Sequence, residues 1–358
     1  MTAYGAELLF SRFPSLHQRL VRSDIGCQTT PVHRLTRLYP DYPAGVWVKC
    51  DDQSNLYYGG NKPRKLEFLL EQAKQDGNRG VITVGGFGTN HGLATAILCE
   101  QQGLDCHLVL FPQPVTEHVK AHLVLFARHG AELHRVDYPV EALVRAASLW
   151  GAGRLNRDPL MYIPPGGSNA LGALGFVGAA LELAEQVREG VMPEPTHLFV
   201  PVGSCGTMAG LVAGLRLAGL STTVVGVRVI DRLTANRRRI AGLSNAVIDL
   251  LKRNGASPLP APIRAGELHL LGDYMGPAYG AVTHPALNAM RAAKRLENID
   301  VEITYSAKCL AALTDWVNSH PNGGPLLWWN TYAGDRWIQQ LGEIAVDHVP
   351  ELFRDLFS

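Results

Sequence analysis

The order in which short apolar segments and helical patterns alternate is the feature that most limits the fold. From residue 80 onward, apolar runs of strand length, such as VITVGG (81–86), are followed by stretches of helical length, such as HGLATAILCEQQG (91–103). This alternation is typical of parallel sheets whose strands are joined by right-handed helical crossovers. We therefore predict an α/β protein.

The alternation occurs in two series, which predict two parallel-sheet α/β lobes. The 358 residues are enough for two lobes, each with a core of its own. Clusters of glycine and proline near residue 60 and at 164–167 indicate the boundaries. We expect a small domain at 65–175 and a large domain built from 1–64 and 176–358.

Composition narrows the class of partner. Thirty-three Lys and Arg against thirty-two Asp and Glu give a net charge of +1, so no strong field attracts nucleic acid or an acidic membrane, and we expect a small-molecule ligand. The six cysteines form no CxxC pair, which favours reduced thiols in the cytoplasm and no metal framework. The sequence shows no signal-peptide pattern and no apolar run of about 20 residues, so we expect no membrane segment.

A lysine lies directly before a predicted helix in YYGGNKPRKLEFLL (57–70). Pro63 fits the first helical position, which places Lys62 at the helix start. The positive end of a helix disfavours an ammonium ion, so it favours a neutral amine that can attack a carbonyl and form a Schiff base. The alternative is that Lys62, Arg64 and Lys65 only form a solvated basic edge.

A second strand-to-helix junction is VGGFGTNHGLATA (84–96). Its backbone N–H groups and the side chains of Thr89, Asn90 and His91 predict a donor-rich cradle that would suit a substrate carboxylate. A dinucleotide-binding turn, and with it a nicotinamide-dependent oxidoreductase, is the weaker alternative. His91 stands where the third glycine of that motif belongs, and no acid for a ribose follows the next strand.

A third junction is VPVGSCGTMAGL (200–211). Its consecutive N–H groups and two hydroxyls predict a phosphate site that needs no metal, with close helix packing as the alternative. An imine-forming lysine, a phosphate site and a carboxylate cradle together indicate pyridoxal 5'-phosphate with an amino-acid substrate. The phosphate-site residues are Ser204, Cys205, Gly206 and Thr207.

Five motifs occur in the order found in one family of enzymes: GGNKPRKLEF, TNH, IPPGGSNALGALGFVGAALE (163–182), GSCGTMAGL and YSAK (305–308). In these segments the chain resembles the D-cysteine desulfhydrase and 1-aminocyclopropane-1-carboxylate deaminase family. The resemblance implies the tryptophan synthase β-like fold (fold type II), pyridoxal phosphate as cofactor, and a homodimer.

The resemblance also implies roles for individual residues. Lys62 would hold the cofactor and move the α-proton of the substrate, and residues 204–207 would bind the phosphate. Asn90 would hydrogen-bond the phenolic oxygen of the cofactor. The residues expected beside the substrate are Thr89 and His91, near its carboxylate, and Tyr279 and Tyr305, whose phenols could relay a proton.

The residue after the second tyrosine bears on the reaction. The resemblance places an acid there in the deaminase branch, whereas this chain has Ser306. A hydroxyl from Ser306 or Thr331 could only hydrogen-bond the pyridine nitrogen, so the ring would withdraw electrons less strongly. We therefore expect α,β-elimination from a small amino acid with a β-leaving group, giving pyruvate and ammonia. The alternatives are 1-aminocyclopropane-1-carboxylate deaminase activity and an L-cysteate lyase-like activity.

Some segments depart from the family pattern. Gly88 precedes Thr89, Cys205 stands at a common glycine position, and WWNTYAGD (328–335) is unusually bulky. These changes raise an alternative of another class, a protein that binds pyridoxal phosphate without turnover. The aromatics Tyr57, Tyr58, Trp328 and Trp329 could face a substrate, although core positions are more usual. Histidines 118 and 122, four apart on a predicted helix, are expected to be packing or surface residues rather than metal ligands.

Overall fold

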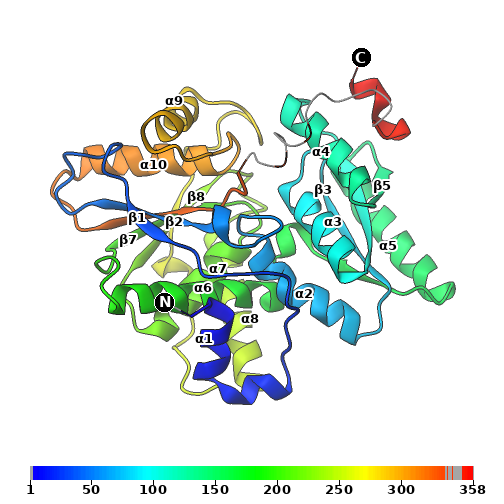
Figure 1. Cartoon of the computed structure of the whole chain (residues 1–358), viewed down its shortest axis with the longest axis horizontal. Helices are drawn as coiled ribbons and strands as arrows, with labels where there is room; N and C mark the ends of the chain where they lie inside the picture. Colours follow the sequence, from blue (N-terminus) through cyan, green and yellow to red (C-terminus); the bar gives the residue numbers. More distant parts are fainter. Residues whose placement is uncertain (1–2, 335–336, 338–340, 342–348, 358) are drawn as a thin grey trace. The chain divides into compact units, whose positions relative to one another are not determined.

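A computed structural model describes residues 3–334, 337, 341 and 349–357, in two compact units (Figure 1). The first unit comprises the described residues up to Val21, together with Gly26–Lys65 and Ser168–Gly334. The second comprises Arg22–Ile25, Leu66–Gly167 and the described residues beyond 334. The first division falls after residue 65, one residue from the expected boundary, whereas the second falls after residue 167 rather than 175. Arg22–Ile25 and residues 349–357, which were expected in the large domain, group with the second unit.

The first unit contains a six-stranded sheet in the order β1-β2-β10-β7-β8-β9. Every neighbouring pair is parallel except β1 and β2, which are antiparallel. This pair departs from the expected parallel pattern because only a short loop joins its strands, and a parallel pair needs a long crossover. The strands are β1 Val32–Arg34, β2 Val46–Cys50, β7 His197–Val202, β8 Thr223–Arg228, β9 His269–Leu271 and β10 Leu326–Asn330.

Helices cover both faces of this sheet. Figure 1 shows α9 and α10 on one side and α6 and α7 on the other. By length and composition α6 could cross a membrane, but 78% of its apolar window is buried inside the protein, so it is a core helix. The helices are α1 Gly5–Arg12, α6 Ala170–Arg188, α7 Gly206–Ala218, α8 Arg237–Arg253, α9 His284–Ala292 and α10 Ser306–Ser319, and α2 Pro63–Gln75 begins here and continues in the second unit.

The second unit has a four-stranded, fully parallel sheet in the order β5-β4-β3-β6. Helices α3 and α4 connect β3 to β4 and β4 to β5 in one direction, whereas α5 returns the chain to β6. Right-handed crossovers therefore place α5 on the opposite face from α3 and α4. The elements are β3 Gly80–Gly86, α3 Asn90–Gln102, β4 Asp105–Phe111, α4 Glu117–Arg128, β5 Glu132–Arg135, α5 Pro139–Leu155 and β6 Leu160–Ile163.

A buried ionic network holds the first unit together around Glu182 of α6. Glu182 Oε1 lies 2.6 Å from Lys49 Nζ, Glu182 Oε2 lies 3.0 Å from Arg64 Nη1, and Arg64 Nη2 lies 3.0 Å from Asp51 Oδ1. All four side chains are fully buried. Burial alone would raise the pKa of Glu182, but Arg64 and Lys49 outweigh it and lower that pKa to about 2.

This network also sets the start of α2. Arg64 is two residues after Lys62. A Cβ at Gly175 of α6 would lie only 1.7 Å from the Arg64 carbonyl oxygen, so α6 contacts the first turn of α2 directly. Gly60, with φ of +81°, adopts a conformation that favours glycine, and a Cβ there would lie 2.9 Å from the Thr331 carbonyl oxygen. The segment that carries Lys62 is therefore held between α6 and the end of β10.

We predict that Glu182→Gln lowers the free energy of unfolding by about 3–5 kcal/mol, because it leaves two buried cations with one carboxylate. Urea denaturation followed by circular dichroism at pH 7 measures this loss. The difference from wild type should shrink as pH falls from about 4.3 toward 2, since Glu182 contributes stability only while it is ionised.

The matched control is Glu185→Gln on the same helix. Glu185 pairs with Arg188, which is 67% exposed, so its loss should change stability by less than about 1 kcal/mol. Equal losses in the two variants would contradict a dominant role for the buried network.

Candidate active site

Lys62 and the predicted phosphate loop are joined through the side chain of Asn61. Lys62 Nζ donates to Asn61 Oδ1 at 2.6 Å, and Asn61 Nδ2 donates to Thr207 Oγ1 at 3.0 Å. Asn61 and Thr207 are both buried. The amine and the start of α7 therefore belong to one site within the first unit.

The amine of Lys62 is unusually easy to deprotonate. Burial lowers the pKa of Lys62 to about 8, and the carboxylate of Glu302 opposes this shift. At pH 7 about one amine in ten is then neutral, against fewer than one in a thousand for an ordinary lysine. The direction agrees with the sequence-based expectation, but the main cause is desolvation rather than the helix end.

The loop at 203–207 follows β7 and is supported by Ser168 and Lys65, neither of which the sequence analysis assigned to the phosphate site. The alternative of a solvated basic edge is wrong for Arg64 and Lys65, because both are buried. Ser168 Oγ donates to Ser204 Oγ at 2.7 Å and accepts from Gly206 N–H at 3.2 Å and from Lys65 Nζ at 3.4 Å. Lys65 lies in the first turn of α2, and burial lowers its pKa. A serine and a lysine thus join the predicted loop residues as donors for a phosphate.

Backbone geometry shapes this loop. Cys205, the N-cap of α7, has φ of +73°, a left-handed conformation that is uncommon for a residue with a side chain. Successive N–H groups in such a turn point into a concave nest that binds anions. A Cβ at Gly206 would lie 2.5 Å from Ser168 Oγ and 3.0 Å from Lys65 Nζ, so only glycine leaves this cradle open. The residues present therefore fit a phosphate.

The two predicted tyrosines meet. Their phenol oxygens lie 2.7 Å apart, and the Tyr305 ring packs against Gly203, where a Cβ would lie 2.9 Å from Cε1. Burial raises the pKa of both phenols, so both remain protonated at neutral pH. Tyr279 and Tyr305 can therefore pass a proton along one hydrogen bond beside the phosphate loop.

Glu302 lies four residues before the first residue of α10 and was not expected at the site. Its Oε1 accepts from the N–H groups of Tyr305 at 2.7 Å and Ser306 at 2.9 Å, and its Oε2 accepts from Thr304 N–H at 2.7 Å. Ser306 Oγ in turn accepts from Glu302 N–H at 2.9 Å. The carboxylate thus anchors Tyr305, and it acts on Lys62 through its charge. Thr331, the other predicted partner of the pyridine nitrogen, accepts from Asn61 N–H through its carbonyl at 3.1 Å.

The predicted carboxylate cradle lies in the second unit, at the end of β3. Thr89 is the N-cap of α3, and its Oγ1 accepts from Gly92 N–H at 3.2 Å. Asn90 and His91 form the first residues of the helix, and His91 is buried. A Cβ at Gly88 would lie 2.8 Å from Val119 Cγ2, so a larger residue at this position would require Val119 to shift.

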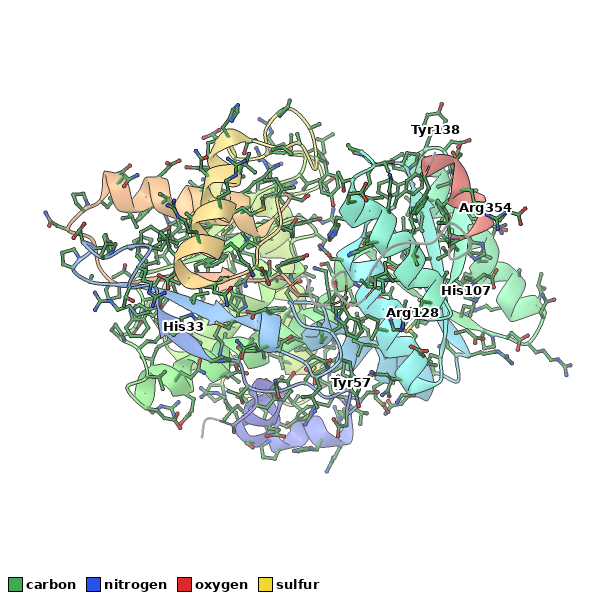
Figure 2. All side chains as sticks on the ribbon, turned by 45° about the horizontal axis from the view of Figure 1, so that its top comes forward. His33, Tyr57, His107, Arg128, Tyr138 and Arg354 are labelled. Atoms are coloured by element: carbon green, nitrogen blue, oxygen red, sulfur yellow. The ribbon has the colours of Figure 1, made fainter. Side chains whose placement is uncertain are left out.

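The bulky aromatics are mostly core residues. Trp328 and Trp329 are fully buried, and Trp329 Nε1 donates to Asp51 Oδ2 at 2.6 Å. Tyr58 is buried, whereas Tyr57 is exposed at the surface (Figure 2). The rings of His118 and His122 lie 4.0 Å apart, and His122 is buried, as expected for packing residues.

A readily deprotonated lysine beside an anion-binding turn, at the carboxyl ends of parallel strands, defines the class of α/β enzymes that use pyridoxal phosphate. The chain belongs to that class: the family model described as pyridoxal-phosphate dependent enzyme matches residues 24–324. The cofactor of this family is the one that the sequence predicted.

Relatives and solved structures agree with this assignment. The chain is 31% identical to a D-cysteine desulfhydrase of Klebsiella pneumoniae (strain 342), over 87% of this chain and 94% of that protein. A D-cysteine desulfhydrase of Salmonella paratyphi A is 30% identical over the same shares. The crystal structure of an ACC deaminase homologue, 28% identical, has a TM-score of 0.79 and covers 92% of this chain and 97% of its own. These matches confirm the family resemblance and the fold type.

We predict that Gly206→Ala raises the Kd for pyridoxal phosphate by about tenfold or more, because the added methyl group displaces Ser168 and Lys65 from the cradle. Titration of the apo-protein with the cofactor measures this. The control is Gly242→Ala in α8, where a Cβ would meet nothing within 4 Å and the cofactor Kd should not change. An unchanged Kd in Gly206→Ala would contradict the assignment of the cradle to the phosphate.

Proposed function

We propose that this protein catalyses α,β-elimination from a small amino acid that carries a leaving group on its β-carbon. The products would be pyruvate, ammonia and the leaving group, as in a D-cysteine desulfhydrase. One observation carries the proposal: the easily deprotonated Lys62 amine is joined through Asn61 to an anion-binding loop. The match to proteins named D-cysteine desulfhydrase supports the choice of reaction.

Different residues of this chain would hold the cofactor, orient the amine and move the proton. When bound, pyridoxal phosphate supplies an aldehyde that captures amines and a ring that withdraws electrons from the α-carbon of the substrate. Lys62 would hold the aldehyde carbon and later accept the α-proton at Nζ. The loop 204–207, with Ser168 and Lys65, would hold the phosphate. Asn61 orients Nζ by accepting its hydrogen bond.

Two further groups complete the proposal. Tyr305 and Tyr279, protonated and hydrogen-bonded to each other, would deliver a proton to the departing group or to the product. Thr89, Asn90 and His91 would hold the substrate carboxylate at the N-terminus of α3, where N–H groups favour an anion. Asn90 would also hydrogen-bond the phenolic oxygen of the cofactor.

Elimination is favoured over opening of a cyclopropane ring because no acid follows Tyr305. The residue there is Ser306, and its hydroxyl already takes part in the first turn of α10 through Glu302. A neutral partner from Ser306 or Thr331 at the pyridine nitrogen would leave the cofactor a weaker electron sink. Departure of a good leaving group needs less stabilisation of negative charge than ring opening does.

We predict that Lys62→Ala abolishes both the visible absorption of the cofactor-loaded protein and its elimination activity. In the wild type, borohydride should bleach that absorption, because reduction traps the bond between the cofactor and the amine. Lys74→Ala, at the exposed end of the same helix, should behave as wild type. A wild type that stays colourless after cofactor addition would refute the role of Lys62.

The substrate panel should contain both enantiomers of cysteine, cysteate, 3-chloroalanine, serine and 1-aminocyclopropane-1-carboxylate. Release of pyruvate and ammonia from the β-substituted amino acids supports the proposal. Release of 2-oxobutyrate from the cyclopropane substrate, or of pyruvate from cysteate alone, would replace it with the deaminase or L-cysteate lyase-like reaction. Colour without turnover of any substrate would show a cofactor-binding protein that is not an enzyme.

We predict that Tyr305→Phe lowers kcat by about 100-fold or more while the cofactor Kd stays unchanged, because the phenol moves a proton and does not hold the phosphate. Tyr279→Phe combined with Tyr305→Phe should be little worse than the single change, since the pair acts as a unit. Tyr39→Phe, which removes a phenol hydrogen bond of 2.7 Å to Thr314, is the control. Full kcat in Tyr305→Phe would exclude the proposed relay.

A homodimer in the cytoplasm completes the proposal. The family resemblance supports the dimer, and six free cysteines support a reducing compartment. Sedimentation equilibrium and cell fractionation test the two statements, and a monomer or a secreted protein would overturn them.

A further inference from the structure

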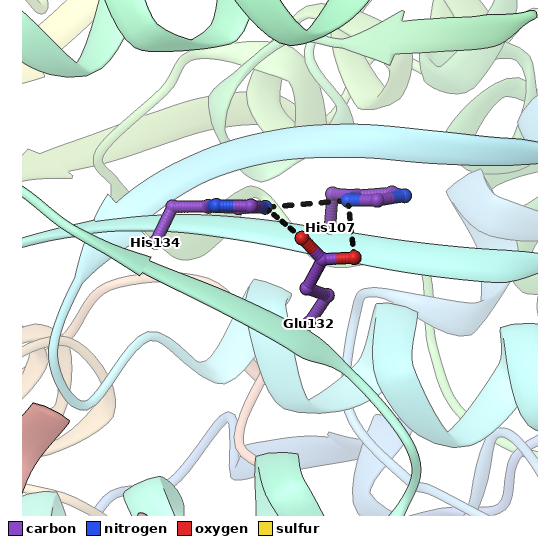
Figure 3. Close-up of side chains that lie close together, drawn as sticks. All are labelled: His107, Glu132 and His134. Carbon is purple, nitrogen blue, oxygen red and sulfur yellow. Dashed lines mark hydrogen bonds and ion pairs between the residues drawn. The ribbon is translucent and has the colours of Figure 1, made fainter. Parts of the chain in front are cut away.

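Two histidines and a glutamate converge on the sheet of the second unit (Figure 3). His107 belongs to β4, while Glu132 and His134 belong to β5. His107 pairs with Glu132 in the parallel register, and His134 is two residues further along, so the three side chains share one face. That face is covered by α5, because Arg145 of α5 contacts His134.

The distances between the three groups match a metal coordination shell. Nδ1 of His107 lies 3.2 Å from Nε2 of His134 and 3.5 Å from Oε2 of Glu132, and Oε1 of Glu132 lies 3.3 Å from His134 Nε2. Ligands bound tetrahedrally to zinc at about 2.0–2.2 Å lie roughly 3.3–3.5 Å from one another. The carboxylate presents a different oxygen to each imidazole, and one ligand atom from each residue lies within 4.8 Å of the others, so the carboxylate and the rings must turn to bring one atom of each to a single ion.

The chemistry of the three groups also suits a metal. Two imidazoles and one carboxylate are the protein ligands of many zinc sites that leave the fourth position to water. The Glu132 side chain is 63% exposed, whereas that of His134 is 7% exposed, so the site has a buried wall and an open mouth. A surface pocket lined by His107, Glu132 and Leu149 of α5 gives an ion access from solvent.

We infer that His107, Glu132 and His134 form a site for a zinc-class divalent ion, with water as the fourth ligand. The site lies on the α5 face, with Glu132 as the first residue of its strand, whereas Thr89–His91 follow the carboxyl end of β3. It is therefore separate from the cradle described above, and it would join the edge strand β5 to β4. The expectation of no metal rested on spacing motifs, which cannot detect ligands that come from different strands.

Arg145 opposes metal binding. Its Nη2 lies 3.3 Å from His134 Nδ1, and because a guanidinium can only donate, Nδ1 must accept and the ring proton sits on Nε2. A metal at Nε2 requires that proton to move to Nδ1 through solvent, after which two donors face each other. Arg145 is exposed and can turn away. Removal of its charge should therefore strengthen binding.

The test is equilibrium dialysis of the chelator-treated, cofactor-loaded full chain against Zn²⁺. We expect one ion per chain in the wild type, at least about tenfold weaker binding in Glu132→Gln and in His107→Gln, and tighter binding in Arg145→Gln. Tetrahedral Co²⁺, read by its visible d–d bands, should compete for the same site. Thermal unfolding without metal checks that each variant is folded.

The matched control is Glu100→Gln. Glu100 Oε2 lies 2.6 Å from His129 Nδ1, so it offers a single histidine–carboxylate pair on the surface of the same unit. Zn²⁺ binding should not change in this variant. Failure of the wild type to bind Zn²⁺, or equal binding by wild type and Glu132→Gln, would overturn the inference. Since Glu132 is largely exposed, its replacement should not unfold the chain.

Discussion

The buried carboxylate of Glu182 is the constraint on which the first unit depends. An ionised carboxylate removed from water is tolerated only when charges and N–H groups surround it. Glu182 meets this condition with Lys49 and Arg64 and with the N–H groups of Gly5 and Thr30. These partners come from β2, α2, the start of α1 and the segment before β1. Movement of any of these four segments would take a partner away from the buried carboxylate. The core therefore fixes the position of the chain just before Arg64, which carries Lys62.

The strained loop shows a similar dependence of function on packing. Cys205 adopts a left-handed conformation that costs a residue with a side chain about 1–2 kcal/mol. Its thiol is buried, 3.9 Å from the Gly203 carbonyl and 4.0 Å from the Thr234 carbonyl. Glycine is common at this position in the family, but this chain has cysteine in the same left-handed conformation. The shape of the turn is therefore maintained at the expense of stability. In the proposed function, that shape is what would let the loop hold the phosphate of the cofactor.

The strand-to-helix junctions and Lys62 could be predicted from sequence because their signals are local. A proline at the first helical position, a run of glycines and hydroxyl residues after a strand, and the β/α alternation all lie within a few residues of one another. Lys65 and Ser168 were missed because 103 residues separate them, and Ser168 lies in an irregular segment. Glu302 was missed because its side chain caps α10, a role that depends on where the helix starts. The low pKa of Lys62 was expected for the wrong main reason, since burial is a tertiary property.

Sites at the carboxyl ends of parallel strands differ from sites on the face of a sheet in how well a sequence predicts them. At the carboxyl ends of strands, each turn brings new N–H groups and side chains together, so chemistry gathers there and leaves local motifs in the sequence. On the face of a sheet, neighbours are set by register, and His107 meets Glu132 only because β4 and β5 pair in one of several possible alignments. A metal held across that register would stabilise one alignment of a four-residue edge strand, which has a ladder on one side only. Such an ion would act on the folding of the second unit and not on the proton transfers assigned to Lys62 and Tyr305.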